Sequence, residues 1–190
     1  MDADGVTLAC ATRAELRAAR RAGARAVLVG LGASRGVPDG PLVSFGLAGA
    51  LRDDLPVGTV VDATRVVDLD GAELWSGEGL GVSQAGTILA GNAIVDDPAE
   101  RRRLHAQTGA DAVDLESGEL ARTGRLHGVV RAVSDTPSRP LDGLVGGVNA
   151  DGGYSWAGLA WAFARSPRSF VRSASDARRA LDRLRRSWAA

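Results

Sequence analysis

Two short apolar segments of the chain each end in carboxylate and hydroxyl side chains. Asp111-Ala-Val-Asp-Leu-Glu-Ser117 carries Glu116, and Val129-Val-Arg-Ala-Val-Ser-Asp135 carries Asp135. Their Val-rich cores favour buried strands, and the helical pattern between them predicts neighbouring βα units of one sheet. Ligands of such sheets bind outside the carboxyl ends of the strands. These residues therefore indicate acid, base or hydroxyl-binding chemistry.

A third carboxylate, Glu15, follows an apolar strand predicted at 6–10. Thr12 and Glu15 have the spacing of a capping box, in which the threonine caps a helix and the glutamate bonds back to the cap amide. The position also belongs to the crevice at the strand ends, so capping and chemistry compete for one side chain. Glu116 and Asp135 have structural alternatives too, at a helix start and in a turn.

The elements that position these carboxylates alternate between strand and helix. Between them, Gly71 and the glycines at 77–81 predict a hairpin and a loop, and alternation at 59–69 predicts a strand with one wetter face. The pattern predicts an α/β fold, a single domain over residues 1–190 with a mixed, mostly parallel central sheet flanked by helices. The predicted strands lie at 6–10, 25–30, 41–45, 59–69, 87–90 and in the two segments above, and the helices at 12–22, 96–108, 116–123 and within 153–188.

Two glycine-rich segments follow predicted strands. Gly46-Leu-Ala-Gly49 comes directly after the strand at 41–45, where backbone amides can approach a small ligand such as a sugar or a phosphate. The glycines at 30–36 have the position of a dinucleotide loop. Val37-Pro38 follows them, however, and forbids the helix that would receive a pyrophosphate, so we expect no dinucleotide there.

Composition excludes several classes of function. The formal net charge is zero, which gives no global attraction to nucleic acid. Two histidines and one cysteine support neither a metal site nor a Ser-His-Asp triad. Cys10 lies in an apolar strand, where a small buried thiol is the expected role. Asp2 and Asp4 do not fit a signal peptide, and no apolar run suits a transmembrane helix, so we expect a cytoplasmic protein.

The C-terminal part of the chain is rich in arginine and tryptophan. Between Arg165 and Arg186 eight arginines face two acids, Asp176 and Asp182. The simpler interpretation is that two helices pack on the sheet through apolar stripes. The alternative is a basic, tryptophan-bearing surface that contacts anionic lipid. The stripes are Trp156, Leu159, Ala160 and Phe163 in one helix and Leu181, Leu184 and Trp188 in the next.

Taken in order, these segments resemble the purine nucleoside phosphorylase and nucleosidase superfamily, over roughly residues 6–140. The segment Ser44-Phe-Gly-Leu-Ala-Gly-Ala-Leu51 and the short length look most like the hopanoid-associated phosphorylases, which are assigned to removing adenine from adenosylhopane. The other matching segments are 6–15, Leu55-Pro-Val-Gly-Thr-Val-Val61, Ile88-Leu-Ala-Gly-Asn-Ala-Ile94, Val113-Asp-Leu-Glu-Ser117 and Arg131-Ala-Val-Ser-Asp135.

The resemblance implies a role for each matched residue. Asp135 would be the general acid at purine N7, oriented by Ser134, and Glu116 would accept a hydrogen bond from a ribose hydroxyl. Glu15 would position and activate an attacking water. The residues that would line the nucleoside pocket are Ala48, Gly49, Asn92, Ile94, Val95 and Leu115. The resemblance also implies a homodimer that acts on a purine nucleoside, specifically an adenosine derivative, with no cofactor other than phosphate as a co-substrate.

Three departures from the family pattern leave the nucleophile and the activity open. Ile94 stands where adenine-cleaving relatives often have an aromatic residue, and Asn92 stands where many have Asp. The Gly-Asp-Pro-x-Arg phosphate loop of many phosphorylases is missing, with Arg35 or Arg52 as substitutes. The readings are therefore phosphorolysis, hydrolysis by water, and a nucleoside-binding module that has lost catalysis.

Overall fold

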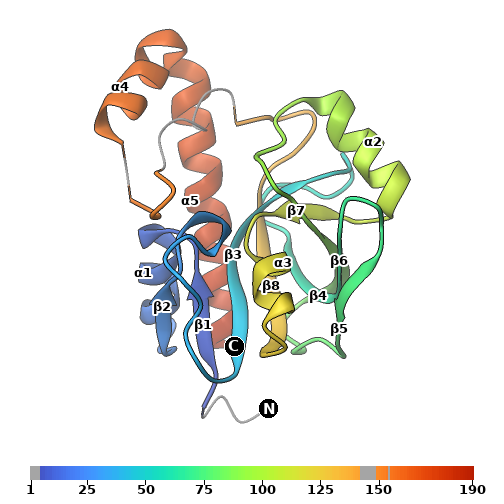
Figure 1. The fold of residues 1–190 in the computed structure, drawn as a ribbon. Helices are drawn as coiled ribbons and strands as arrows, with labels where there is room; N and C mark the ends of the chain where they lie inside the picture. Colours follow the sequence, from blue (N-terminus) through green and yellow to red (C-terminus); the bar gives the residue numbers. More distant parts are fainter. Residues whose placement is uncertain (1–4, 142–148, 154) are drawn as a thin grey trace.

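The computed structural model describes residues 5–141, 149–153 and 155–190, apart from the side chains of residues 156–158 and 162. Asp2, Asp4 and the side chain of Trp156 lie outside this part of the chain. Figure 1 shows the elements in chain order. They are β1 (Thr7–Cys10), α1 (Arg13–Arg21), β2 (Ala26–Leu28), the 3₁₀ turn η1 (Leu31–Ala33), β3 (Leu42–Ala50), β4 (Val60–Val67), β5 (Glu73–Ser76), β6 (Gln84–Ala90), α2 (Pro98–Thr108), β7 (Ala112–Asp114), α3 (Ser117–Arg122), β8 (Leu126–Asp135), α4 (Trp156–Arg165) and α5 (Pro167–Ala189).

The described strands form one mixed sheet, which confirms the predicted α/β class. Parallel pairs join β1 to β2, β1 to β3, β3 to β8, β4 to β6 and β6 to β7. Antiparallel pairs join β3 to β7, β4 to β5 and β4 to β8. Because β8 pairs with both β3 and β4, the strands β3, β8, β4, β6 and β7 close into a ring.

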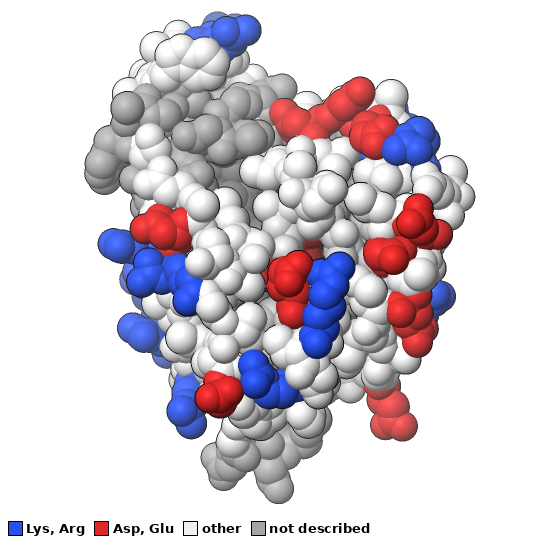
Figure 2. Space-filling view, in the orientation of Figure 1, with Lys and Arg blue, Asp and Glu red and all other residues white. Residues whose placement is uncertain are grey.

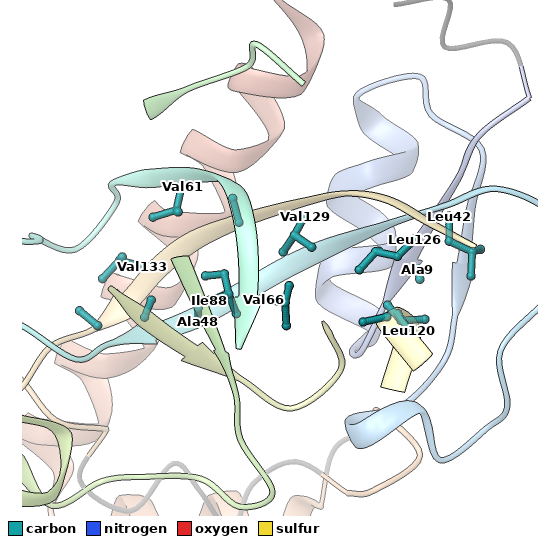
Figure 3. Packing of buried hydrophobic residues seen from close by; sticks show 14 of the residues in the cluster. Ala9, Leu42, Ala48, Val61, Val66, Ile88, Leu120, Leu126, Val129 and Val133 are labelled. Atoms are coloured by element: carbon teal, nitrogen blue, oxygen red, sulfur yellow. The ribbon is translucent and has the colours of Figure 1, made fainter. Parts of the chain in front are cut away.

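Alternate residues of the central strands face opposite sides of the sheet, as the period of two requires. One face packs against α1 and α5 through residues such as Cys10, Phe45 and Ala132. The other face packs against Leu120 of α3 (Figure 3). Both faces of these strands are therefore buried, which explains their near-continuous apolar runs.

Local capping signals set the ends of the helices that border the site. Thr12 caps α1 in the predicted capping box, because its side chain accepts from the Glu15 amide while Glu15 bonds back to Thr12. Asp97 caps α2 with Pro98 in the first turn, as predicted. Gly109, with φ of 69°, ends α2 in the left-handed region where glycine is favoured.

Two sequence expectations about strands are wrong. The segment 46–49 is not a loop after a strand, because β3 continues through it to Ala50. The predicted wetter face of β4 is mostly dry: Asp62 on this strand is buried and accepts hydrogen bonds from the amides of Leu80 and Val82. A polar residue in an alternating pattern can thus be an internal clamp for a loop rather than a sign of solvent.

The C-terminal helices differ in how they pack. α5 lies along the sheet, with Leu184 buried and Trp188 in an edge-to-face contact with Phe45, 5.9 Å between ring centroids. α4 contacts α5 but leaves Trp161 60% and Phe163 48% exposed. The packing interpretation therefore holds for α5, whereas much of the apolar surface of α4 faces outward.

Charges of both signs lie on the face drawn in Figure 2. Basic side chains gather on the side where α1 lies, and acidic ones on the side of α2 and β5. No helix in the part of the chain that the structure describes is both long and apolar enough to cross a membrane.

Candidate active site

A cavity of about 450 Å³ lies at the carboxyl ends of β1, β6, β7 and β8, between α5 and the segment 93–95. Glu15, Glu116 and Asp135 all line it, as the sequence predicted from their places after strands. Their exposed fractions are only 3% each. In Figure 1, α4 and α2 lie on either side of this end of the molecule. The structure therefore brings three buried carboxylates to one hollow.

Glu15 divides its two oxygens between the helix and the cavity wall. Its Oε2 accepts from the amide of Thr12 at 2.7 Å, which completes the capping box. Its Oε1 accepts from the amide of Leu47 on β3 at 2.8 Å. Capping and cavity lining, which compete for this carboxylate at the sequence level, are thus both satisfied by one side chain.

Glu116 is free for the cavity because another residue caps α3. Asp114, at the end of β7, accepts from the amide of Ser117 at 3.0 Å, whereas Glu116 makes no side-chain cap bond. Glu116 instead accepts from the amide of Gly32 at 3.1 Å and from Arg131 Nη2 at 3.3 Å. Burial raises the pKa of Glu116 to about 8, because Arg131 only partly offsets the desolvation.

Arg131 is a buried cation that the sequence analysis did not assign to the site. Its Nε lies 2.6 Å from Asp114 Oδ2 in an ion pair, and its Nη2 donates to Ser44 Oγ at 2.6 Å. The signal in the sequence was its place in a strand with two apolar residues on each side, where a buried charge requires partners. Arg131 holds Glu116 and Asp114 together below the cavity.

Asp135 is aimed by a bulge at the end of β8. Ala48 pairs with Val133 and Gly49 with Asp135, so Ser134 is an extra residue in the register. Ser134 Oγ donates to Asp135 Oδ1 and also lies 3.3 Å from the Ala48 carbonyl oxygen. The described partners of the Asp135 side chain are Ser134 and Arg101, not the backbone of the turn at 136–139. Burial raises its pKa, although Arg101 and Ser134 act in the opposite direction.

Arg101 is the second buried cation of the site, and the sequence analysis missed it. It projects from α2 with 1% exposure and forms an ion pair with Asp135 through Nη2. Its Nε donates to the Val95 carbonyl at 2.8 Å, and its Nη1 donates to the Ala50 carbonyl at 3.3 Å. Arg101 lines the cavity and connects the acid to two walls of it.

Two glycines of β3 make room for these charged pairs. A Cβ at Gly46 would lie 2.5 Å from Glu15 Oε1 and would also overlap the Arg131 guanidinium. A Cβ at Gly49 would lie 2.9 Å from Asp135 Oδ2 and 3.3 Å from Arg101 Nη1. Close approach of backbone to charged side chains is thus the reason for glycine inside a strand.

The other predicted site residues divide into two groups. Ala48, Gly49, Ile94, Val95, Leu115 and Ser134 line the cavity. Asn92 lines an adjacent hollow instead. This hollow shares residues 93–95 with the cavity but contains none of the three carboxylates. Arg35 and Arg52, the predicted phosphate substitutes, do not line the cavity and form ion pairs elsewhere, with Asp151 and Asp111.

The C-terminal helices supply an apolar wall opposite the carboxylates. Arg178 lies at its exposed edge. This wall consists of Leu159, Phe170, Ala174, Ala177 and Leu181. Among the residues that the structure describes, no group of His, Cys, Asp and Glu side chains is arranged to hold a metal ion. Cys10 is buried, and burial raises the pKa of its thiol, which suits an inert core residue.

Comparisons with known proteins define the fold. No protein-family model and no curated protein matches the chain. Among solved structures, a putative 5′-methylthioadenosine/S-adenosylhomocysteine nucleosidase from Francisella philomiragia is similar with a TM-score of 0.63 and 15% identity, over 96% of this chain and 95% of that one. The corresponding Helicobacter pylori nucleosidase is similar with a TM-score of 0.61 and 15% identity, over 96% of this chain and 94% of that one. The futalosine hydrolase of Helicobacter pylori is similar with a TM-score of 0.59 and 14% identity, over 96% of each chain. The chain thus has the α/β fold of these nucleosidases.

Proposed function

We propose that the protein cleaves the N-glycosidic bond of a purine nucleoside with water as the nucleophile. The observation that carries this proposal is the balance of buried charge beside Gly46. Among the described residues, the cation that faces the acidic side chains of Glu15, Glu116 and Asp114 is Arg131, so two carboxylates face one guanidinium even while Glu116, with its raised pKa, keeps its proton. An excess of carboxylate favours a cationic sugar and a neutral water, and it repels a phosphate anion. The fold shared with nucleosidases is consistent with the same activity.

The roles follow from the charge that develops during cleavage. Positive charge builds on the sugar and negative charge on the departing purine. Glu15 lies where it would stabilise a cationic sugar and hold the attacking water, and Glu116 would form a hydrogen bond with a sugar hydroxyl. Asp135 lies at the end of β8, 19 residues after Glu116, and would serve the base. A positioned acid contributes roughly 10²–10⁴-fold, so the carboxylates near the sugar must supply much of the remaining rate.

One experiment separates the nucleophiles. Purified protein is incubated with purine nucleosides with and without phosphate, and both the released base and the sugar product are measured. We expect free ribose at a rate independent of phosphate. If the product is ribose 1-phosphate and forms only when phosphate is present, the reaction is phosphorolysis and the proposed hydrolysis is wrong.

A second candidate is a nucleoside-binding module without turnover. The Arg101–Asp135 ion pair favours it, because the guanidinium stabilises the ionised carboxylate, which has no proton to donate, against the effect of burial. In the same experiment this candidate predicts saturable nucleoside binding by calorimetry with no release of base. Measurable turnover that Asp135→Asn abolishes would reject it.

For the finer substrate, the sequence resemblance implies an adenosine derivative such as adenosylhopane, and the contacts of the cavity support only the apolar 5′ group of such a substrate. The apolar wall of Leu159, Phe170 and Leu181 supports an apolar 5′ substituent. The adenine base has no such support, because none of the described contacts favours an exocyclic amine. Cleavage of 5′-alkylthio nucleosides in preference to ribonucleosides with a free 5′ hydroxyl is the expected result. Equal kcat/KM for both would remove the apolar 5′ group from the proposal.

Assembly and location remain proposals as well. We propose a cytoplasmic homodimer that contacts membranes peripherally through its C-terminal helices. Trp161 and Phe163 are exposed on α4, and the Arg165 guanidinium lies 5.2 Å from the Trp161 ring centroid. Co-sedimentation with anionic but not zwitterionic vesicles is expected, and light scattering should give twice the monomer mass. Absence of vesicle binding would leave only the packing role of these helices.

A further inference from the structure

Three polar side chains beside the cavity contact β3 in linear order. Arg131 contacts the Leu47 carbonyl at 3.4 Å, Ser134 contacts that of Ala48 at 3.3 Å, and Arg101 contacts that of Ala50 at 3.3 Å. A strand advances about 3.3 Å per residue, so these contacts span roughly 10 Å. Arg131 marks the end with Glu15 and Glu116, Ser134 holds Asp135 in the middle, and Arg101 occupies the far end.

A purine nucleoside bound as proposed fits this order in only one direction. The sugar lies with Glu15 and Glu116, and N7 of the base lies at Asp135. The next group on the same edge of the purine, farther from the sugar, is the substituent on C6. Arg101 lies on that side of Asp135 and lines the cavity there.

We propose that Arg101 reads the C6 substituent and makes the protein selective for 6-oxopurine nucleosides, those of hypoxanthine and guanine. This inference rests on the proposed function. A guanidinium has five N–H donors and no acceptor. It donates to O6 of a 6-oxopurine but has nothing to accept the N–H groups of a 6-aminopurine. Arginine bonded to O6 and N7 is the commonest specific contact to guanine in the major groove, for the same reason.

The hydrogen bonds of Arg101 leave donors for this task. Nε is committed to the Val95 carbonyl, one N–H of Nη1 to the Ala50 carbonyl, and one of Nη2 to Asp135. The remaining N–H on each terminal nitrogen has no partner closer than Asp96 Oδ1, 3.9 Å from Nη2, among the described residues. Asp135 Oδ2, the oxygen that would otherwise accept from an exocyclic amine, is occupied by Arg101 itself.

The arrangement also excludes the competing base. An adenine amine would face a cationic donor in a water-poor site, so two N–H donors would be buried without an acceptor. The O6 of hypoxanthine gains negative charge as the glycosidic bond breaks, so its contact with Arg101 strengthens toward the transition state. Selectivity should therefore appear in kcat as well as in KM.

The test compares inosine and guanosine with adenosine, as kcat/KM for the full chain. We expect a preference of at least about tenfold for the 6-oxopurines, and hypoxanthine as a stronger product inhibitor than adenine. Equal cleavage, or a preference for adenosine, would overturn this inference and leave the proposed function intact. Failure to cleave any of the three or their 5′-alkylthio derivatives, by contrast, counts against the proposed function, and tighter binding of hypoxanthine than of adenine by calorimetry would still support the role of Arg101.

Two variants assign the selectivity to Arg101. Arg101→Gln replaces the pure donor by an amide that both donates and accepts, so the inosine-to-adenosine ratio should fall about tenfold or more. Arg102→Gln is the matched control, because Arg102 is the exposed neighbour on α2, pairs with Asp53 and lines neither cavity. Arg101→Lys, which keeps the charge, guards against loss of folding. An unchanged ratio in a folded Arg101 variant would reject the assignment.

Discussion

Asp135 stands between a serine hydroxyl and a guanidinium, and each partner occupies one of its oxygens. Asp135→Asn removes the ionisable proton but keeps the shape of the side chain. We expect turnover to fall by roughly 10²–10⁴-fold while nucleoside affinity changes little. Steady-state cleavage and calorimetric binding measure the two effects. Full activity in the variant would remove Asp135 from the chemistry.

Glu116 should make the stability of the protein depend on pH. Its folded-state pKa of about 8 exceeds the unfolded value near 4.5, so the folded state binds more protons between these two pH values. The stabilisation is therefore full below pH 4.5 and is lost as the pH rises through 8.

We expect the melting temperature of the wild type to decline between about pH 5 and pH 9. Glu116→Gln cannot ionise and should flatten this decline. Scanning calorimetry across the range gives the two slopes directly. Parallel slopes in the two proteins would show that other groups cause the decline.

At the scale of elements, β3 is the structure on which the site is built. Gly46→Ala places a Cβ against the carboxylate of Glu15 and the guanidinium of Arg131. We expect a loss of activity of at least about tenfold together with a lower melting temperature. The matched control is Gly128→Ala on β8, where the atoms nearest to a Cβ belong to the apolar side chain of Leu80, at 2.8 Å. Equal losses of activity in both variants would argue against a special role for Gly46.

Local signals predicted the helices and most strands but not the course of β3. Asp97 and Pro98 fix the start of α2 by themselves, so the first residue of this helix could be predicted from the sequence. Gly46 and Gly49 discourage a strand by propensity. They occur in one because the charged groups of other elements approach it, and those elements are distant in sequence.

The same reasoning explains which site residues were missed. The three carboxylates were found because each follows a strand. Arg101 belongs to the run Arg101-Arg102-Arg103, in which two members are exposed and ion-paired at the surface. The available signal was the spacing of Arg101 and Leu104, which are the two buried residues of α2 and lie three apart on one face. A charge on the apolar stripe of a helix thus indicates a buried partner.

For the molecule as a whole, α5 both supports the sheet and closes the cavity. Leu184 is fully buried against the sheet, whereas Leu181, one turn earlier, is half-buried and lines the cavity. Leu184→Ala should lower the free energy of unfolding by about 2–5 kcal/mol. Leu181→Ala should cost less stability and instead raise KM for a substrate with an apolar 5′ group. Urea unfolding and steady-state kinetics on both variants measure this division, and an equal pattern in the two would contradict it.

The helix cap at Thr12 has a consequence for how the protein loses activity. Glu15 ties the first turn of α1 to β3 by two hydrogen bonds from a single side chain. If that turn frays, the carboxylate also leaves the amide of Leu47, so the position proposed for the attacking water is lost while the sheet is still closed. Folding of the first turn of α1 and correct placement of the Glu15 carboxylate are therefore one local equilibrium. On warming, activity would be lost when this single helical turn frays, while the core is still folded.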